Sequence, residues 1–199
     1  MKPEIKICGI KTLAVAKAAA KGAGYAGFIF EQSSPRAVSP AKAAKIREAL
    51  PPGVKTVGVF VSAGTLGILA AMREARLDIV QLHRSSSDEE IRMLKDAGYG
   101  VWILDDGAMP GSGAADGVLV DAKDGGKTGG TGKRSDWSRA RELASRGVFT
   151  ILAGGLSADN LDEAAKTGAS VLDVNSSLET SPGRKSAALV RNLLRSREA

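Results

Sequence analysis

Short segments rich in β-branched residues alternate with Ala-, Leu-, Lys- and Glu-rich segments along the whole chain. This alternation is typical of repeated βα units whose strands pair in parallel. Eight units of about 25 residues fit the chain, and eight such units close into a (β/α)8 barrel, the TIM barrel. The sequence therefore predicts an α/β fold with a single TIM-barrel domain over residues 1–199. The strands are expected at Glu4–Cys8, Tyr25–Phe30, Lys55–Val61, Asp78–His83, Gly100–Leu104, Gly117–Asp121, Val148–Ala153 and Ser170–Val174.

The helical segments carry start and stop signals. In SDEEIRMLKDAG, Ser87 and Glu90 have capping-box spacing, and Gly98 falls where a glycine commonly ends a helix. The fifth unit differs, because DDGAMPGSGAAD between Leu104 and Gly117 is short and rich in Gly and Pro. The helix of the fifth crossover is therefore expected to be short or missing.

An open doubly wound sheet shows the same alternation, and GAGYAG at residues 22–27 matches its dinucleotide fingerprint. That fingerprint needs a strand before it and a helix after it, whereas here the predicted helix comes first. GGKT at residues 125–128 resembles the end of a P-loop, but the first glycine of that motif would fall on Asp121. Neither pattern favours a nucleotide site.

Composition excludes several function classes. The single Cys and single His allow no internal disulfide and no structural zinc site. No apolar run approaches ~18 residues and the start MKPEI lacks a signal-peptide core, so a cytoplasmic protein without membrane contact is expected. The net charge of +6 arises from cations interleaved with acids, a pattern that favours a solvated surface or an anionic small molecule over nucleic acid.

In such a barrel the chemistry lies where strands end, so the residues there are the candidates. Cys8 ends the first predicted strand and Asp121 ends the sixth, with Lys123 just after it. These strands are three steps apart around a closed barrel, which places Cys8 and Asp121 on opposite sides of its mouth. A base and an acid on either side of a bound molecule suit proton transfer. Taken singly, Cys8 could be a small buried hydrophobe and Asp121 a loop cap.

Two glycine- and serine-containing loops follow the seventh and eighth strands, where barrels often bind phosphate. Backbone N–H groups at these loops can approach an anion, although a Gly-Gly pair can also be a simple tight turn. The basic, Gly-rich segment 121–137 could be a lid or a surface insertion. The expected phosphate-binding residues are Gly154, Gly155, Asn175, Ser176 and Ser177.

Three further residues at strand ends are expected to contact the substrate. Arg36 in SSPR could form a bidentate pair with a carboxylate, though an isolated arginine is usually solvated. His83 could contact the substrate or be a hydrogen-bonded structural residue. Asp173 ends the eighth strand beside the phosphate loop and completes this group.

Several motifs occur in the same order as in one known family. KICGIKT, GFIF with SPRAVSP, VGVFV, QLH, VDAK, GGTGK with DW, ILAGGL, and DVNSS followed by Glu179 cover nearly the full chain. The chain thereby resembles the phosphoribosylanthranilate isomerase family. The family usually has DVSSGVE and GGLN where this chain has DVNSSLE and GGLS, so Asn175, Ser177 and Ser157 are departures.

The resemblance implies a (β/α)8 enzyme of tryptophan biosynthesis that converts the phosphosugar N-(5-phosphoribosyl)anthranilate into its 1-deoxyribulose isomer by an Amadori rearrangement. It implies that Cys8 is the general base, Asp121 the general acid and Arg36 the group that holds the anthranilate carboxylate. Such chemistry needs one protonated acid and one ionised base, without metal or cofactor. We expect a monomer or homodimer.

Two alternatives stay open. The ProFAR isomerase of histidine synthesis performs the same rearrangement, but that family resembles two fused half-barrels and normally has Asp where Cys8 stands. A basic RNA-binding module would show binding that weakens steeply with salt and would be indifferent to Cys8.

Overall fold

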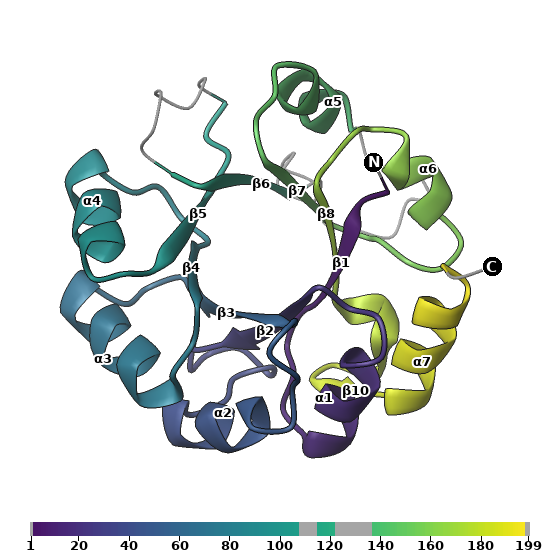
Figure 1. Cartoon of the computed structure of the whole chain (residues 1–199), viewed down its shortest axis with the longest axis horizontal. Coiled ribbons are helices and arrows are strands. Elements are labelled where there is room, and N and C mark those ends of the chain that lie inside the picture. The colour runs from purple at the N-terminus through teal and green to yellow at the C-terminus, as the bar shows by residue number, and fades with distance from the viewer. Residues whose placement is uncertain (1, 108–114, 122–136, 198–199) are drawn as a thin grey trace.

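The computed structural model describes residues 2–107, 115–121 and 137–197. Within these ranges eight parallel strands form a closed barrel in chain order, with β8 paired to β1 (Figure 1). The predicted (β/α)8 barrel is therefore confirmed. The strands are β1 Glu4–Ile7, β2 Tyr25–Ile29, β3 Lys55–Phe60, β4 Ile79–Leu82, β5 Gly100–Leu104, β6 Gly117–Asp121, β7 Thr150–Ala153 and β8 Val171–Val174.

Helices surround the barrel as an outer ring (Figure 1). Between β5 and β6 the described residues, 105–107 and 115–116, form no helix, as expected for the fifth crossover. None of the helices in the described ranges has the length and apolarity needed to span a membrane. The helices are α1 Leu13–Ala19, α2 Pro40–Arg47, α3 Thr65–Ala75, α4 Asp88–Asp96, α5 Ser138–Ser145, α6 Leu161–Ala165 and α7 Ala187–Arg195.

The ends of α4 show which part of the predicted capping box forms. The Ser87 hydroxyl accepts the Glu90 backbone N–H at 3.2 Å, as the spacing predicted. The Glu90 carboxylate does not return this bond, because it accepts hydrogen bonds from Arg84 at 2.7 and 2.8 Å and from Thr65. The reciprocal half of the box was thus a wrong prediction, since a partly buried ion pair with arginine outweighs a local backbone contact. Gly98 follows the helix with φ of +92°, as a helix-ending glycine should.

The barrel wall separates two apolar layers. Ile5 and Ile7 of β1 belong to the cluster packed beneath the helices, whereas Lys6 and Cys8 alternate with them and face the barrel interior. A second apolar cluster, which includes Trp102 and Leu119, fills the interior from the other strands. The interior becomes polar toward the carboxyl ends of the strands, and this positions the site.

After β8 the chain forms a short 3-10 turn, η1 Ser176–Leu178, and a small antiparallel pair, β9 Glu179–Ser181 with β10 Arg184–Lys185. Gly183 joins these two strands at φ of +77°, and a Cβ there would lie 2.2 Å from the carbonyl oxygen of Pro35. This hairpin therefore packs tightly against the loop after β2, which carries Arg36.

Candidate active site

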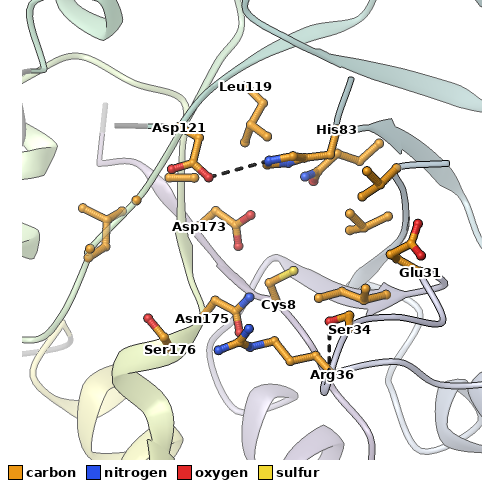
Figure 2. Close-up of a pocket in the computed structure, with 18 residues that line it drawn as sticks. Cys8, Glu31, Ser34, Arg36, His83, Leu119, Asp121, Asp173, Asn175 and Ser176 are labelled. Carbon is orange, nitrogen blue, oxygen red and sulfur yellow. Dashed lines mark hydrogen bonds and ion pairs between the residues drawn. The ribbon is translucent and has the colours of Figure 1, made fainter. Parts of the chain in front are cut away.

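A cavity of about 290 Å³ opens at the carboxyl ends of the strands. Figure 2 shows the side chains that line it, with Cys8 and Asp121 apart and Asp173 between them. The cavity brings together all but one of the residues expected at the site. These are Cys8, Arg36, His83, Asp121, Gly154, Gly155, Asp173, Asn175 and Ser176.

Cys8 lies at the cavity floor directly after β1. It is only 4% exposed and packs with Ile29 and Val59, yet it lines the cavity. Burial raises the pKa of its thiol, while the charges of Lys6 and Lys185 oppose that rise. Cys8 is thus both a buried hydrophobe and a group that a ligand in the cavity can reach.

Asp121 lies across the cavity from Cys8, at the end of β6. Its Oδ2 atom is 3.8 Å from His83 Nε2, and both side chains are partly exposed (Figure 2). The acid therefore lies beside an imidazole and not within the apolar layer. His83 and Asp121 together form the polar wall opposite the thiol.

Arg36 is held by a partner that the sequence reasoning did not assign. Its Nε and Nη2 atoms each donate to a Glu179 carboxylate oxygen at 2.8 Å, a bidentate pair. Burial would raise the pKa of Glu179, but the hydrogen bonds from Arg36 and the charge of Lys185 hold it below its usual range. Glu179 was quoted above only as part of a motif. Its pairing with Arg36 depends on the β9–β10 hairpin, which no local sequence pattern predicted.

Lys6 is the second residue the sequence reasoning missed. Its Nζ atom donates to Asp173 Oδ2 at 2.6 Å inside the barrel, and the other oxygen, Oδ1, has no hydrogen-bond partner among the described residues. Gln81 on β4 likewise lines the cavity with its Oε1 unpaired within the described ranges. The signal for Lys6 was available, because residues i and i+2 of a strand share a face and Lys6 stands two before Cys8.

The two expected phosphate loops lie next to each other. Gly154 and Gly155 have φ of +87° and +68°, a conformation that side chains rarely adopt. No acceptor within the described residues pairs with the backbone N–H groups of Gly154, Gly155, Ser176 and Ser177. Four unpaired amides beside one cavity are suited to an anion.

Asn175 and Ser177, which depart from the usual family motif in the loop after β8, both form hydrogen bonds. The Ser177 hydroxyl donates to the Leu156 carbonyl at 2.6 Å, so it ties the two loops together and does not line the cavity. Asn175 lines the cavity, and its backbone and side-chain oxygens both accept hydrogen bonds from Lys185, at 2.7 and 3.2 Å. These contacts orient the loop that presents the amides.

Two expectations fall on residues outside the description. Residues 122–136, which contain Lys123 and most of the proposed lid, lie outside the described residues.

Within the described ranges, no group of three or more His, Cys, Asp and Glu side chains is placed to hold a metal ion.

Comparison with known proteins places this geometry in a family. Residues 5–196 match the family model described as N-(5'phosphoribosyl)anthranilate (PRA) isomerase. The N-(5'-phosphoribosyl)anthranilate isomerase of Granulibacter bethesdensis is 38% identical over 98% of this chain and 97% of its own. The crystal structure of phosphoribosyl anthranilate isomerase from Thermus thermophilus is 33% identical, with a TM-score of 0.83 over 98% of both chains. A phosphoribosyl anthranilate isomerase in complex with reduced 1-(o-carboxyphenylamino)-1-deoxyribulose 5-phosphate is 27% identical, with a TM-score of 0.78 over 98% of both chains. The chain belongs to the N-(5'-phosphoribosyl)anthranilate isomerase family.

Proposed function

We propose that this chain catalyses the aldose-ketose isomerisation of N-(5'-phosphoribosyl)anthranilate in tryptophan biosynthesis, with Cys8 as general base and Asp121 as general acid. One observation carries the assignment of roles. Cys8 and Asp121 approach a single cavity from β1 and β6, and the same cavity is bordered by two loops whose backbone amides have no acceptor in the part of the chain that the structure describes. A phosphosugar anchored by its phosphate would lie between the two groups.

The reaction begins with proton transfers at the ring oxygen and at C2, two atoms that are both bonded to C1. Asp121 donates a proton to the ring oxygen, the bond from that oxygen to C1 breaks, and a protonated imine forms between C1 and the anthranilate nitrogen. The Cys8 thiolate then removes the C2 proton, and the electrons of the broken C–H bond form a C1–C2 double bond and neutralise the nitrogen. The resulting enol takes a proton at C1 and loses the proton of its C2 hydroxyl, which gives the ketone. Each positioned proton transfer accelerates a reaction by about 10²–10⁴-fold.

The remaining residues hold the substrate. Gly154, Gly155 and Ser176 donate backbone hydrogen bonds to the phosphate, and Asn175 and Ser177 shape the loop that presents them. The unpaired Oδ1 of Asp173 accepts a hydrogen bond from a ribose hydroxyl, and His83 contacts the substrate beside Asp121.

Arg36 would hold the anthranilate carboxylate with the part of its guanidinium that Glu179 leaves open. Guanidinium has five N–H donors, of which Glu179 takes one on Nε and one on Nη2. The donors on Nη1 remain for a carboxylate. Glu179 thus orients the Arg36 guanidinium without occupying all of its N–H donors.

Three broader expectations belong to the same proposal. Residues 1–199 form one barrel domain whose ligand is a small phosphosugar. The protein works in the cytoplasm with the rest of its biosynthetic pathway, as a monomer or a homodimer. One solved structure is described as monomers generated from the dimeric phosphoribosylanthranilate isomerase of Thermotoga maritima.

The deciding experiment follows the fluorescence of freshly prepared N-(5'-phosphoribosyl)anthranilate. The wild-type protein should abolish it with saturable kinetics, and Cys8→Ala at equal concentration should be at least 10²-fold slower. A folded wild-type protein that leaves the fluorescence unchanged would contradict the proposal. Turnover of the ProFAR substrate in its place would assign the other isomerase.

A further inference from the structure

A lysine is buried inside the barrel two residues before the proposed base. Lys6 is 0% exposed and is among the largest fully buried side chains. Lys6 and Asp173 are charged side chains buried inside the barrel, and they pair at 2.6 Å. An ion pair in an apolar interior is weak evidence for a role in stability, because apolar side chains of the same volume avoid the cost of desolvation. The pair therefore calls for another explanation.

The lysine and the cysteine border the same small space. A Cβ atom added to Gly27 on β2 would lie 3.1 Å from Cys8 Sγ and 3.2 Å from Lys6 Cε. Glycine at this position leaves room for both side chains to come together. The Lys6 ammonium has three N–H donors, of which Asp173 takes one. Burial would lower the pKa of Lys6, but the charges of Asp173 and Cys8 raise it above its usual value.

A buried cysteine needs such a partner to act as a base. Burial raises the pKa of the Cys8 thiol, whereas removing a C2 proton requires the thiolate. The charge of Lys6 is the largest influence that lowers this pKa; Lys185 also lowers it, and Asp173 raises it. The other ionisable side chains that line the cavity with this thiol are Glu31, Arg36, His83, Asp121 and Asp173.

We propose that Lys6 is the positioning residue of the general base: its ammonium, held beneath the cavity by Asp173, stabilises the Cys8 thiolate. When Cys8 takes the C2 proton, the C–H bond breaks, an S–H bond forms and the negative charge leaves the sulfur. Lys6 then keeps Asp173 as its counter-ion, so no buried cation is left unpaired. The inference rests on the proposed function, because only a base at Cys8 requires the thiolate.

The test measures ionisation of Cys8 directly. Cys8 is the only cysteine of the chain, so the rate of alkylation by iodoacetamide against pH reports this one thiol. The inflection should move up by about one pH unit or more in Lys6→Met, a tenfold loss of thiolate at any pH below both inflections. The rate itself should fall only about threefold per unit, because a more basic thiolate is a better nucleophile. The thiolate absorbance, with Cys8→Ala as blank, gives the same inflection without a reagent.

A matched control separates local charge from net charge. Lys17→Met removes one positive charge from the exposed face of α1 and should leave the inflection in place. Asp173→Asn should move it in the opposite direction, downward, since the carboxylate opposes thiolate formation. Residues with a merely structural role would not shift one inflection in opposite directions.

Lys6→Met leaves Asp173 buried without its partner and can fail to fold. The double variant Lys6→Met with Asp173→Asn removes both charges, and its inflection should still lie above that of the wild type. An unchanged or lowered inflection in Lys6→Met, or in the double variant if the single one does not fold, overturns the inference. Alkylation needs no substrate, so this result stands apart from any failure to isomerise phosphoribosylanthranilate. In an active enzyme, the limb of the kcat/KM profile that belongs to the base should move by the same amount.

Discussion

Glu179→Gln should destabilise the protein by about 2–3 kcal/mol at neutral pH. The carboxylate accepts two hydrogen bonds of 2.8 Å from Arg36 and one of 3.2 Å from the Gly183 backbone, and its side chain is 4% exposed. A hydrogen bond to a charged group contributes ~1.5–3 kcal/mol, and glutamine keeps one acceptor oxygen but turns an amide toward the guanidinium. The nearly buried Lys185, 3.6 Å away, also loses a negative neighbour.

This stabilisation should depend on pH in one direction. The pKa of Glu179 is depressed in the folded protein, so its contribution is fully present above the unfolded value, about 4.5. It is lost as the pH falls through the lower folded value. Wild type and variant should therefore converge in stability on the acid side of pH 4.5.

Urea unfolding followed by circular dichroism at several pH values measures both effects. Glu48→Gln is the control, because Glu48 pairs with Arg76 at 2.7 Å on the open surface. Exposed pairs contribute only ~0–1 kcal/mol, so this variant should be near neutral. Equal losses in the two variants, or a Glu179 effect that is independent of pH, would refute the reasoning.

Four further variants test the site itself. Cys8→Ala and Asp121→Asn should each lower kcat by about 10²–10⁴-fold with a folded circular-dichroism spectrum; near-normal turnover in either removes that residue from the proton transfers. Arg36→Ala should raise KM more than it lowers kcat, because it holds a carboxylate equally in ground and transition states, and an unchanged KM would exclude this role. Gly155→Ala forces a side chain into φ of +68° and should weaken competitive inhibition by inorganic phosphate severalfold; unchanged inhibition would place the phosphate elsewhere.

The local pattern of the chain was enough to determine the barrel. Eight barrel strands were expected and eight close the barrel, because alternating βα units leave few ways to bury both faces of a parallel sheet. Boundaries shifted by one or two residues, as at Val148 and Phe149, which precede β7 instead of opening it. Strand ends depend on pairing with neighbours, and a single segment does not encode its neighbours.

The membership of the site also followed from sequence, because a barrel brings the carboxyl ends of its strands to one mouth. Cys8, Asp121 and the glycines at 154 and 155 could be grouped on that ground alone, and they line one cavity. How deeply each of these residues is buried, and which charges lie near it, could not be predicted in this way. Burial of a thiol is a property of the packed interior and has no local signature.

The ion pairs depended on tertiary structure. Arg36 and Glu179 are far apart in the chain, and they meet only because the β9–β10 hairpin folds back onto the loop after β2. Lys6 and Asp173 meet because β8 closes the barrel onto β1, in the register that places the two residues side by side. Amino-acid sequence by itself therefore determined which elements form and which residues reach the mouth, since these follow from periodicity and chain order. Only the closed barrel decided which charges lie close enough to change one another's ionisation, because electrostatic interaction depends on distance and burial and not on position along the chain.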